Sequence, residues 1–291
     1  MSRRSERVTQ RTLRRWGLPD PGSSKYDRGT VLVVGGALRS PGAAMLAGTA
    51  ALRVGAGRIT LAVARSVAAA VGAAVPEAGI VPLADEDGSV RGDVSLAADL
   101  DDVQCVLVGS GLDDVDAAGG LLAGLIADAP PSVAFVVDAF ALAALARRPS
   151  LADALRGRLV LTPSPTEVGV LLGAEVPSEG RAFARAARAV AERYGAAVAT
   201  QSLVTDADGS AWRIRAGGPG LGTSGSGDVL AGAVAGFAAR GLSPARAAVW
   251  GTYVHAAAGD ELAGRRDGVG YLAGELAGRF PGVIGRMTSV S

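Results

Sequence analysis

Cysteine and histidine are almost absent from this chain of 291 residues, which contains one of each. A single cysteine cannot form an internal disulfide, and Cys105 lies in the apolar run VQCVLVGS, so we expect a reduced thiol in a buried strand. One histidine and one cysteine are too few for a structural zinc site. A Ser-His-Asp triad would have to use His255, which lies in an apolar helical segment and is interpreted as a packing residue.

Aromatic side chains and an excess of either charge are also lacking. Aromatic residues make up 4% of the chain, and 29 Lys and Arg residues against 28 Asp and Glu residues give a net charge of +1. Nucleic-acid and membrane-surface binders need a basic surface, and base stacking needs aromatic rings. We therefore expect neither a nucleic acid nor a membrane as a partner.

Long apolar runs are missing as well. Glycine, proline and charged residues interrupt every stretch that approaches the roughly 18 apolar residues of a membrane-spanning helix. The Arg-rich N-terminus contains Glu6 and lacks the apolar stretch of a secretory signal. We therefore expect a cytoplasmic protein in which residues 1–24 form an N-terminal arm, with a short helix over residues 10–16 capped by Thr9.

Glycine, in contrast, is abundant and is concentrated in the segment GLGTSGSGDVLAGAVAGFAARG at residues 220–241. Gly222, Gly225 and Gly227 alternate with small polar residues, and the apolar residues that follow recur at helical spacing. Backbone N–H groups of such a loop can approach a phosphate closely, and the helix N-terminus adds unpaired donors. The segment therefore predicts a phosphate site.

Asp228 stands in the first turn of the predicted helix. Because a carboxylate repels phosphate, we interpret Asp228 as a general base that takes a proton from the attacking group. The alternative is a stabiliser of the helix N-terminus. The segment is neither a dinucleotide-binding fingerprint, since no acidic residue follows about 20 positions later, nor a P-loop, since no Lys-Ser or Lys-Thr pair closes it.

Strand-like and helix-like segments alternate along the rest of the chain. The predicted strands cover residues 30–36, 58–64, 105–111, 133–139, 158–164 and 196–200. Predicted helices include one that begins at Pro41 after Ser40 and one over residues 181–194, and a hairpin turns at Asp208-Gly209. This alternation predicts an α/β fold, a mostly parallel sheet with helices on both faces, in a single domain over residues 1–291.

The candidate ligand groups follow these strands. Sheets of this kind bind ligands at the carboxyl ends of their strands. The groups placed there are residues 35–36, 109–111, Asp138, 162–167 and 222–228.

Five segments, taken in order, resemble the ADP- or ATP-dependent NAD(P)H-hydrate dehydratases, a branch of the ribokinase-like superfamily. They are LPDPGSSKYDRGTVLVVGG, SPGAAMLAGTAALRVGAGRITLA, VGSGLD, VLTPSPTE and GTSGSGDVLAGAVAGFAARG. The resemblance runs from about Val8 to Ile284 and implies a ribokinase-like three-layer α/β/α fold.

The resemblance also implies a repair reaction. Such enzymes convert the hydrate of NADH or NADPH back to the cofactor at the expense of ADP or ATP. Asp228 would take the proton from the ring hydroxyl, and the oxygen would attack the terminal phosphate while the N–H groups of residues 224–227 hold the developing charge. We expect ADP as co-substrate, giving AMP and phosphate, with Mg²⁺, because members without an attached epimerase domain typically use ADP. A homo-oligomer, a tetramer by resemblance, is also expected.

The remaining site residues are assigned by the same resemblance. Substrate contacts are expected at Ala43, Gly111, Asp138, Ser164 and Glu167. Nucleotide contacts are expected at Gln201, Ser202, Leu203, Val204, Thr205, Ser224, Gly225, Ser226 and Gly227. No residue is assigned as a metal ligand.

The chain departs from the family pattern at several of these positions. Ser164 stands where the family usually has His, and Ser164-Pro165-Thr166-Glu167 also fits a capping box, so Glu167 is either structural or functional. Gln201-Ser202 replaces a Lys-Gly pair, Phe140 replaces an acid, and Asp113 adds one. Two alternatives therefore stay open, a small-molecule kinase of the same superfamily and a nucleotide-binding protein without catalysis.

Overall fold

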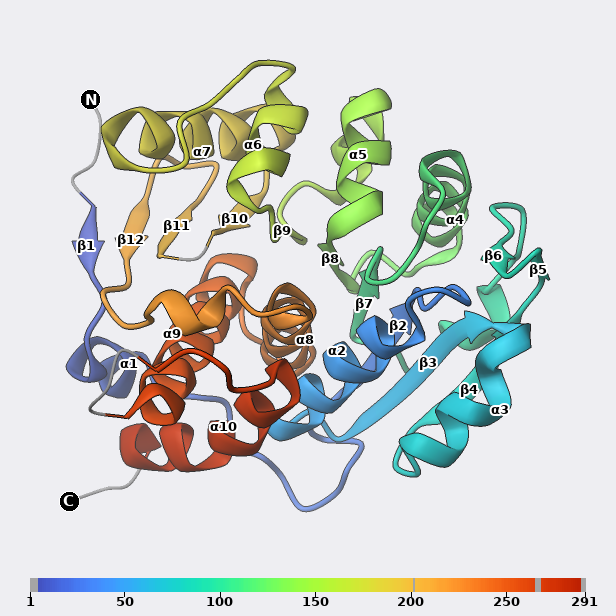
Figure 1. Cartoon of the computed structure of the whole chain (residues 1–291), viewed down its shortest axis with the longest axis horizontal. Coiled ribbons are helices and arrows are strands. Elements are labelled where there is room, and N and C mark those ends of the chain that lie inside the picture. Colours follow the sequence, from blue (N-terminus) through green and yellow to red (C-terminus); the bar gives the residue numbers. More distant parts are fainter. Residues whose placement is uncertain (1–4, 201, 265–267, 289–291) are drawn as a thin grey trace.

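The computed structural model describes residues 5–200, 202–264 and 268–288, and its centre is a ten-stranded sheet (Figure 1). The strand order in this sheet is β1-β12-β11-β10-β9-β8-β7-β2-β3-β4. The strands are β1 (Glu6–Arg7), β2 (Thr30–Val34), β3 (Arg58–Ala64), β4 (Gly79–Leu83), β7 (Cys105–Val108), β8 (Ala134–Val137), β9 (Leu159–Leu161), β10 (Ala197–Ala199), β11 (Leu203–Thr205) and β12 (Ala211–Arg213). A separate small hairpin pairs β5 (Asp85–Glu86) with β6 (Ser89–Val90).

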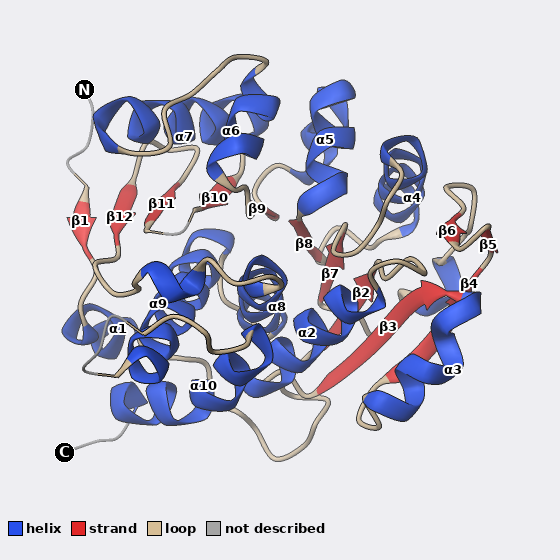
Figure 2. Ribbon diagram, viewed as in Figure 1, coloured by secondary structure: helices blue, strands red, loops and turns tan. Residues whose placement is uncertain are grey.

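Helices cover both faces of the sheet, as Figure 2 shows in blue. The helices are α1 (Gln10–Trp16), α2 (Pro41–Arg53), α3 (Arg65–Ala74), α4 (Val115–Asp128), α5 (Ala139–Arg147), α6 (Pro165–Leu172), α7 (Gly180–Tyr194), α8 (Ser226–Ala239), α9 (Pro244–Ala263) and α10 (Ala273–Thr288). One face carries α4 to α7, and the other carries α2, α8, α9 and α10 (Figure 1). The predicted α/β class and three-layer arrangement are confirmed.

The sheet is parallel from β10 through β4, and β11 runs antiparallel to both of its neighbours. Every residue of β2, β7 and β8 is buried or nearly so, as expected for strands with helices on both faces. Parallel strands place their carboxyl ends at one edge of the sheet, so the turns after β2, β7, β8 and β9 lie together.

Helix α8 is held against α2 by backbone-to-backbone contact. A Cβ atom added to Gly232 would overlap the carbonyl oxygen of Ala47, and one added to Gly236 would lie 2.6 Å from the carbonyl oxygen of Ala51. Glycine is therefore required at these contacts, since any side chain would separate the helices. The close packing fixes the start of α8 beside the start of α2.

Most predicted elements are found, with shorter ends. The strand predicted over residues 105–111 stops at Val108, because Gly109 and Gly111 adopt φ of 123° and 76° and turn the chain. Thr9 caps α1 as predicted, whereas Ser40 occupies the N-cap position of α2 without a side-chain cap bond. The predicted hairpin at residues 208–209 joins β11 to β12. Cys105 is a buried free thiol, as expected.

One large apolar core includes buried residues from Val8 to Met287, and the second cluster of buried residues is much smaller. This continuity supports the single-domain assignment, which stays a prediction. Among the described residues, the structure has no helix long and apolar enough to cross a membrane.

Candidate active site at the carboxyl ends of the central strands

A buried carboxyl group, Asp138, lies at the end of β8 with hydroxyl groups from both neighbouring turns around it. Ser110, after β7, donates a hydrogen bond from Oγ to Asp138 Oδ2 at 3.0 Å, and Thr162, after β9, donates from Oγ1 to Oδ1 at 2.8 Å. All of these residues are buried. The predicted meeting of the strand ends is thereby confirmed for these turns.

Asp228 completes the cluster from the first turn of α8. Burial raises its pKa, while a hydrogen bond from the Ser110 side chain acts in the opposite direction. Burial, followed by the negative charge of Asp228, raises the pKa of Asp138 to about 7, against the hydrogen bonds from Thr162 and Ser110. The negative charge of Asp228 thus favours the protonated form of Asp138.

Glu167 belongs to a capping box and also acts on the cluster. The Ser164 N–H donates to Glu167 Oε2 at 2.7 Å, and the Glu167 N–H donates to Ser164 Oγ at 3.3 Å, so the structural interpretation of this motif is confirmed. The Glu167 charge nevertheless raises the pKa of both Asp138 and Asp228. Contact of Ser164 and Glu167 with substrate stays a prediction.

The glycine loop enters α8 as the sequence predicts. Gly225 is the N-cap residue with φ 85°, and the helix begins at Ser226 with Asp228 in its first turn. A Cβ atom added to Gly225 would lie 4.0 Å from Asp228 Oδ2, whereas one added to Gly227 would meet nothing within 4 Å. There is therefore free space at Gly227 in the first turn of α8, which also contains Asp228, and unpaired N–H groups at a helix start are suited to bind a phosphate.

His255 of α9 is buried, as its interpretation as a packing residue predicts, and it also contacts the first residue of α8. Its Nε2 lies 2.9 Å from Ser226 Oγ in a buried hydrogen bond. Burial lowers the pKa of His255 to about 4, so the ring is neutral at physiological pH. A buried histidine ring needs a hydrogen-bond partner, so a histidine within an apolar stretch of helix could have indicated from the sequence that such a partner exists.

Ala43 and Gly111, both predicted to contact substrate, lie side by side. A Cβ atom added to Gly111 would lie 2.9 Å from Ala43 Cβ and would overlap the Ser40 carbonyl oxygen. Gly111 also has φ of 76°, so a larger residue is excluded by both conformation and space. The N-terminus of α2 therefore borders the same strand ends.

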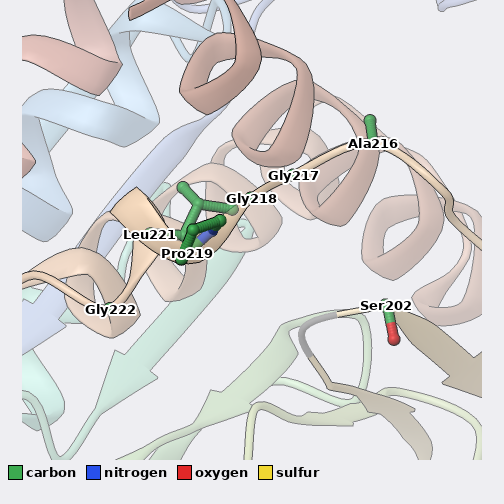
Figure 3. A pocket seen from close by; sticks show the side chains of 7 residues that line it. All are labelled: Ser202, Ala216, Gly217, Gly218, Pro219, Leu221 and Gly222. Atoms are coloured by element: carbon green, nitrogen blue, oxygen red, sulfur yellow. The ribbon is translucent and has the colours of Figure 1, made fainter. Parts of the chain in front are cut away.

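A cavity of about 440 Å³ lies next to the loop that leads to α8 (Figure 3). It is lined by Ser202, Ala216, Gly217, Gly218, Pro219, Leu221 and Gly222. Ser202 was predicted as a nucleotide contact and Gly222 as part of a candidate ligand group, whereas residues 216–219 were not predicted, although a Gly-Gly-Pro-Gly run at residues 217–220 was the available signal.

The other residues of the predicted nucleotide segment are placed differently. Leu203, Val204 and Thr205 form β11 and are buried, and Thr205 Oγ1 donates to the Ala187 carbonyl oxygen at 3.2 Å. Gln201 lies outside the described residues. Nucleotide contact by this segment stays a prediction. In the part of the chain that the structure describes, no group of three or more His, Cys, Asp or Glu side chains is arranged to hold a metal ion.

Comparison with known proteins decides the family. Residues 31–281 match the family model of the NAD(P)H-hydrate dehydratases. The chain belongs to this family. It is 42% identical over 285 residues to the ADP-dependent (S)-NAD(P)H-hydrate dehydratase of Xanthomonas campestris, covering 96% of each chain.

Other members of the family match over different shares of their length. Identity to the ADP-dependent (S)-NAD(P)H-hydrate dehydratase of Neisseria meningitidis is 33%, over 89% of this chain and 84% of that protein. Identity to the bifunctional NAD(P)H-hydrate repair enzyme of Moorella thermoacetica is 37%, over 88% of this chain and 49% of that protein.

Solved structures give the same fold. The ADP/ATP-dependent NAD(P)H-hydrate dehydratase of Bacillus subtilis, co-crystallised with ATP and Mg²⁺, superposes with a TM-score of 0.79 at 25% identity, over 97% of this chain and 99% of that chain. Arabidopsis thaliana ribokinase superposes with a TM-score of 0.60 at 13% identity, over 90% and 99% of the two chains. The predicted family and the ribokinase-like fold are confirmed.

Proposed function

We propose that this chain dehydrates the hydrates of NADH and NADPH in an ADP-dependent reaction that yields AMP and phosphate. The observation that carries the proposal is the match over 96% of both chains to a dehydratase named as ADP-dependent. The site supports it, because a carboxylate beside a glycine-rich helix N-terminus fits a base next to a phosphate.

In the proposed mechanism, Asp228 removes the proton from the hydroxyl group on the nicotinamide ring. The hydroxyl oxygen forms a bond to the terminal phosphorus of ADP, and the bond between that phosphorus and the AMP oxygen breaks. N–H groups of residues 224–227 stabilise the charge on the transferring phosphoryl group. The ring nitrogen lone pair then expels phosphate, and loss of a proton from the neighbouring ring carbon restores the double bond.

Burial makes Asp228 suited to this step. Its raised pKa makes the carboxylate a stronger base than an exposed aspartate. The buried hydrogen bond between Ser226 and His255 holds the loop that would receive the phosphate. The neutral state of His255 leaves no compensating positive charge at this point, so the attraction for phosphate would come from backbone N–H groups.

Mg²⁺, a homo-oligomeric state and a cytoplasmic location complete the proposal. Mg²⁺ commonly binds nucleotide phosphates with few protein ligands and several waters. A site with few protein ligands fits this chain, because the carboxyl group at the end of β8 is already engaged. Both oxygens of Asp138 accept hydrogen bonds, one from Ser110 and one from Thr162. Size-exclusion chromatography with light scattering tests the expected tetramer.

The function is tested by incubating the protein with hydrated NADH and ADP while the absorbance of the reduced nicotinamide is followed. We expect NADH, AMP and phosphate in equal amounts, and no turnover without nucleotide. A stable phosphorylated product would indicate the kinase alternative, and nucleotide binding without turnover would indicate the non-catalytic one.

The Asp228→Asn variant tests the assignment of the base. Asn keeps the size of the side chain, so a helix-stabilising role predicts a loss of about 1 kcal/mol or less and nearly normal turnover. A general base predicts that turnover falls by about 10² to 10⁴ while folding is preserved. ADP affinity, measured by calorimetry, should hold or increase because a negative charge beside the phosphate is removed. Turnover within a few-fold of wild type would rule out Asp228 as the base.

A further inference from the structure

The loop over residues 217–226 connects the wall of the cavity to the start of α8. Gly217 and Gly222 line the cavity, and Ser226 is the first residue of α8, two positions before Asp228. Half of the residues in this 217–226 loop are glycine. Glycine backbones sample many conformations, so contacts with the rest of the fold must determine the shape of the loop.

Asp260 of α9 holds the beginning of the 217–226 loop. Its Oδ1 accepts a hydrogen bond from the Gly217 N–H at 2.9 Å. Gly217 has φ of 94°, and a Cβ atom added to it would lie 2.8 Å from Leu221 Cδ1 and 3.3 Å from Ala256 Cβ. Gly217 thus lies against α9 in a conformation that favours glycine, and Asp260 binds its one backbone donor at the wall of the cavity (Figure 3).

The middle of the loop packs on the same helix through Leu221. A Cβ atom added to Gly259 of α9 would lie 2.7 Å from Leu221 Cδ2. Two hydrogen bonds close the turn itself, from the Leu221 N–H to the Gly218 carbonyl oxygen at 3.1 Å and from the Gly222 N–H to the Pro219 carbonyl oxygen at 3.0 Å. Local bonds therefore shape the turn, and α9 positions it.

His255, which precedes Asp260 in the same helix, holds the end of the loop. Its Nε2 is 2.9 Å from Ser226 Oγ in a buried hydrogen bond. Ser226 is 5% exposed, so its hydroxyl group faces α9, whereas a Cβ atom added to Gly227 would meet open space. The bond therefore supports the start of α8 from the side of the protein interior, and neither side chain needs to touch a ligand for it to act.

These contacts come from one face of α9, because residues i, i+1, i+4 and i+5 of a helix lie on the same side. His255 and Asp260 form the polar contacts, and Ala256 and Gly259 between them are small enough for the loop backbone to approach. The helix itself packs on α8 and α10 and contacts β10. It therefore offers the glycine-rich loop a template that the rest of the fold holds in place.

We propose that Asp260 and His255 are positioning residues that hold the 217–226 loop in its binding shape before the nucleotide arrives, Asp260 for the binding of ADP and His255 for phosphoryl transfer. This inference rests on the proposed dehydratase function and extends the same site. Asp260 acts on the cavity wall, which the nucleotide would contact in the ground state and the transition state alike. His255 acts on Ser226, where the proposed mechanism places the charge of the transferring phosphoryl group. A loop that is ordered in advance loses less conformational freedom on binding.

Two substitutions of Asp260 separate its hydrogen bond from its charge. Asp260→Ala removes the acceptor for the Gly217 N–H, so the KM for ADP should rise about fivefold or more while kcat changes less than about twofold. Asp260→Asn keeps an acceptor oxygen, so it should return the KM for ADP to within about twofold of wild type. A lower KM in both variants would mean that the carboxylate charge repels the nucleotide, and would overturn the positioning role. Glu261→Ala is the control, because it removes a neighbouring carboxylate that pairs with Arg286.

His255→Leu removes the bond to Ser226. We expect kcat to fall about tenfold or more, with the KM for ADP changed less than about threefold, because support for the transition state is lost while the cavity wall is kept. His255→Gln offers both a donor and an acceptor, so it should recover most of the rate whichever partner donates. Thr252→Val is the control, because the buried Thr252 hydroxyl donates to the Ala248 carbonyl oxygen within α9. A wild-type rate in His255→Leu would overturn the role of His255.

Ser226→Ala breaks the same bond from the other side. It should be as slow as His255→Leu, and the double variant should be no slower than either single one, because both remove one interaction. The test also holds if His255→Leu does not fold, since a wild-type rate in Ser226→Ala would then overturn the role of the bond.

Hydrogen–deuterium exchange of the ligand-free protein gives a readout that does not require turnover. Exchange should become about tenfold faster or more in residues 217–222 of Asp260→Ala and in residues 223–227 of His255→Leu, but not in the two control variants. Unaltered exchange in either variant overturns the role of that residue whether or not the wild type turns over. The expected exchange, together with no turnover of hydrated NADH by wild type in the presence of ADP, overturns only the dehydratase function.

Discussion

At the scale of single residues, Asp138 and His255 make opposite contributions to stability over the same pH range. Burial lowers the pKa of His255 to about 4, so the folded state binds fewer protons than the unfolded state between about pH 4 and 6.5. Stability from this group is therefore lost as the pH falls through that range. Burial raises the pKa of Asp138 to about 7, so the folded state binds more protons between about pH 4 and 7, and stability increases as the pH falls.

Replacing each group should expose the contribution of the other. Each amounts to about 3 to 4 kcal/mol across its range, or about 1.4 kcal/mol per pH unit. Relative to wild type, Asp138→Asn should lose stability more steeply on acidification, and His255→Gln, which keeps a partner for Ser226, less steeply. Urea unfolding between pH 4.5 and 7.5 measures these slopes. Parallel profiles of the three proteins would show that neither group is perturbed as described.

The sequence identifies some of these residues and not others. Asp228 and Asp138 lie in recognisable motifs at a helix start and a strand end. Ser110 and Thr162 meet at Asp138 only through the register of three parallel strands, which no single segment encodes. The contact between Ser226 and His255 likewise depends on how α8 packs on α9, and neither helical segment indicates by itself which residue of the other it meets.

At the scale of elements, the packing of α8 on α2 predicts a large effect from one methyl group. Ala is preferred over Gly in a helix by about 1 kcal/mol, yet a Cβ atom at Gly232 would overlap a backbone oxygen of α2 that cannot rotate away. We expect Gly232→Ala to destabilise the fold by about 1 to 3 kcal/mol. Turnover should also fall, because the start of α8 would move relative to α2. Thermal unfolding and the NADH assay measure both effects.

Gly124→Ala in α4 is the matched control. A Cβ atom at Gly124 meets nothing within 4 Å, so this variant should be as stable as wild type or up to about 1 kcal/mol more stable. If Gly232→Ala behaves like Gly124→Ala, the helices are not in the close contact described here.

Elements with strong local patterns could be predicted, and edge elements could not. The central strands are apolar throughout, and α7 ends at Tyr194 before Gly195, as its sequence indicates. The strand β4 was not predicted, because its GIVPL sequence contains Pro82 and is largely accessible. Proline is tolerated there because β4 is the edge strand beside β3, a position that only the assembled sheet defines.

At the scale of the whole molecule, the cavity of about 440 Å³ joins two parts of the fold. Ser202 reaches it from the turn between β10 and β11, and residues 216–222 reach it from the loop before α8 (Figure 3). A nucleotide bound there, with its phosphates at the start of α8, would contact both parts. Binding would therefore stabilise the entire chain against unfolding, by about 2.7 kcal/mol at a free ADP concentration 100 times the Kd.

Gly218→Leu tests this coupling. Gly218 lines the cavity, and a Cβ atom added to it meets nothing within 4 Å, so a leucine can enter the cavity without disturbing the fold. We expect a melting temperature close to wild type without ligand, loss of most of the increase caused by ADP with Mg²⁺, and a KM for ADP raised about tenfold or more, since tenfold corresponds to about 1.4 kcal/mol of lost binding. Gly278→Leu, on open surface of α10, should keep the full ADP effect. An undiminished ADP effect in Gly218→Leu would place the nucleotide elsewhere.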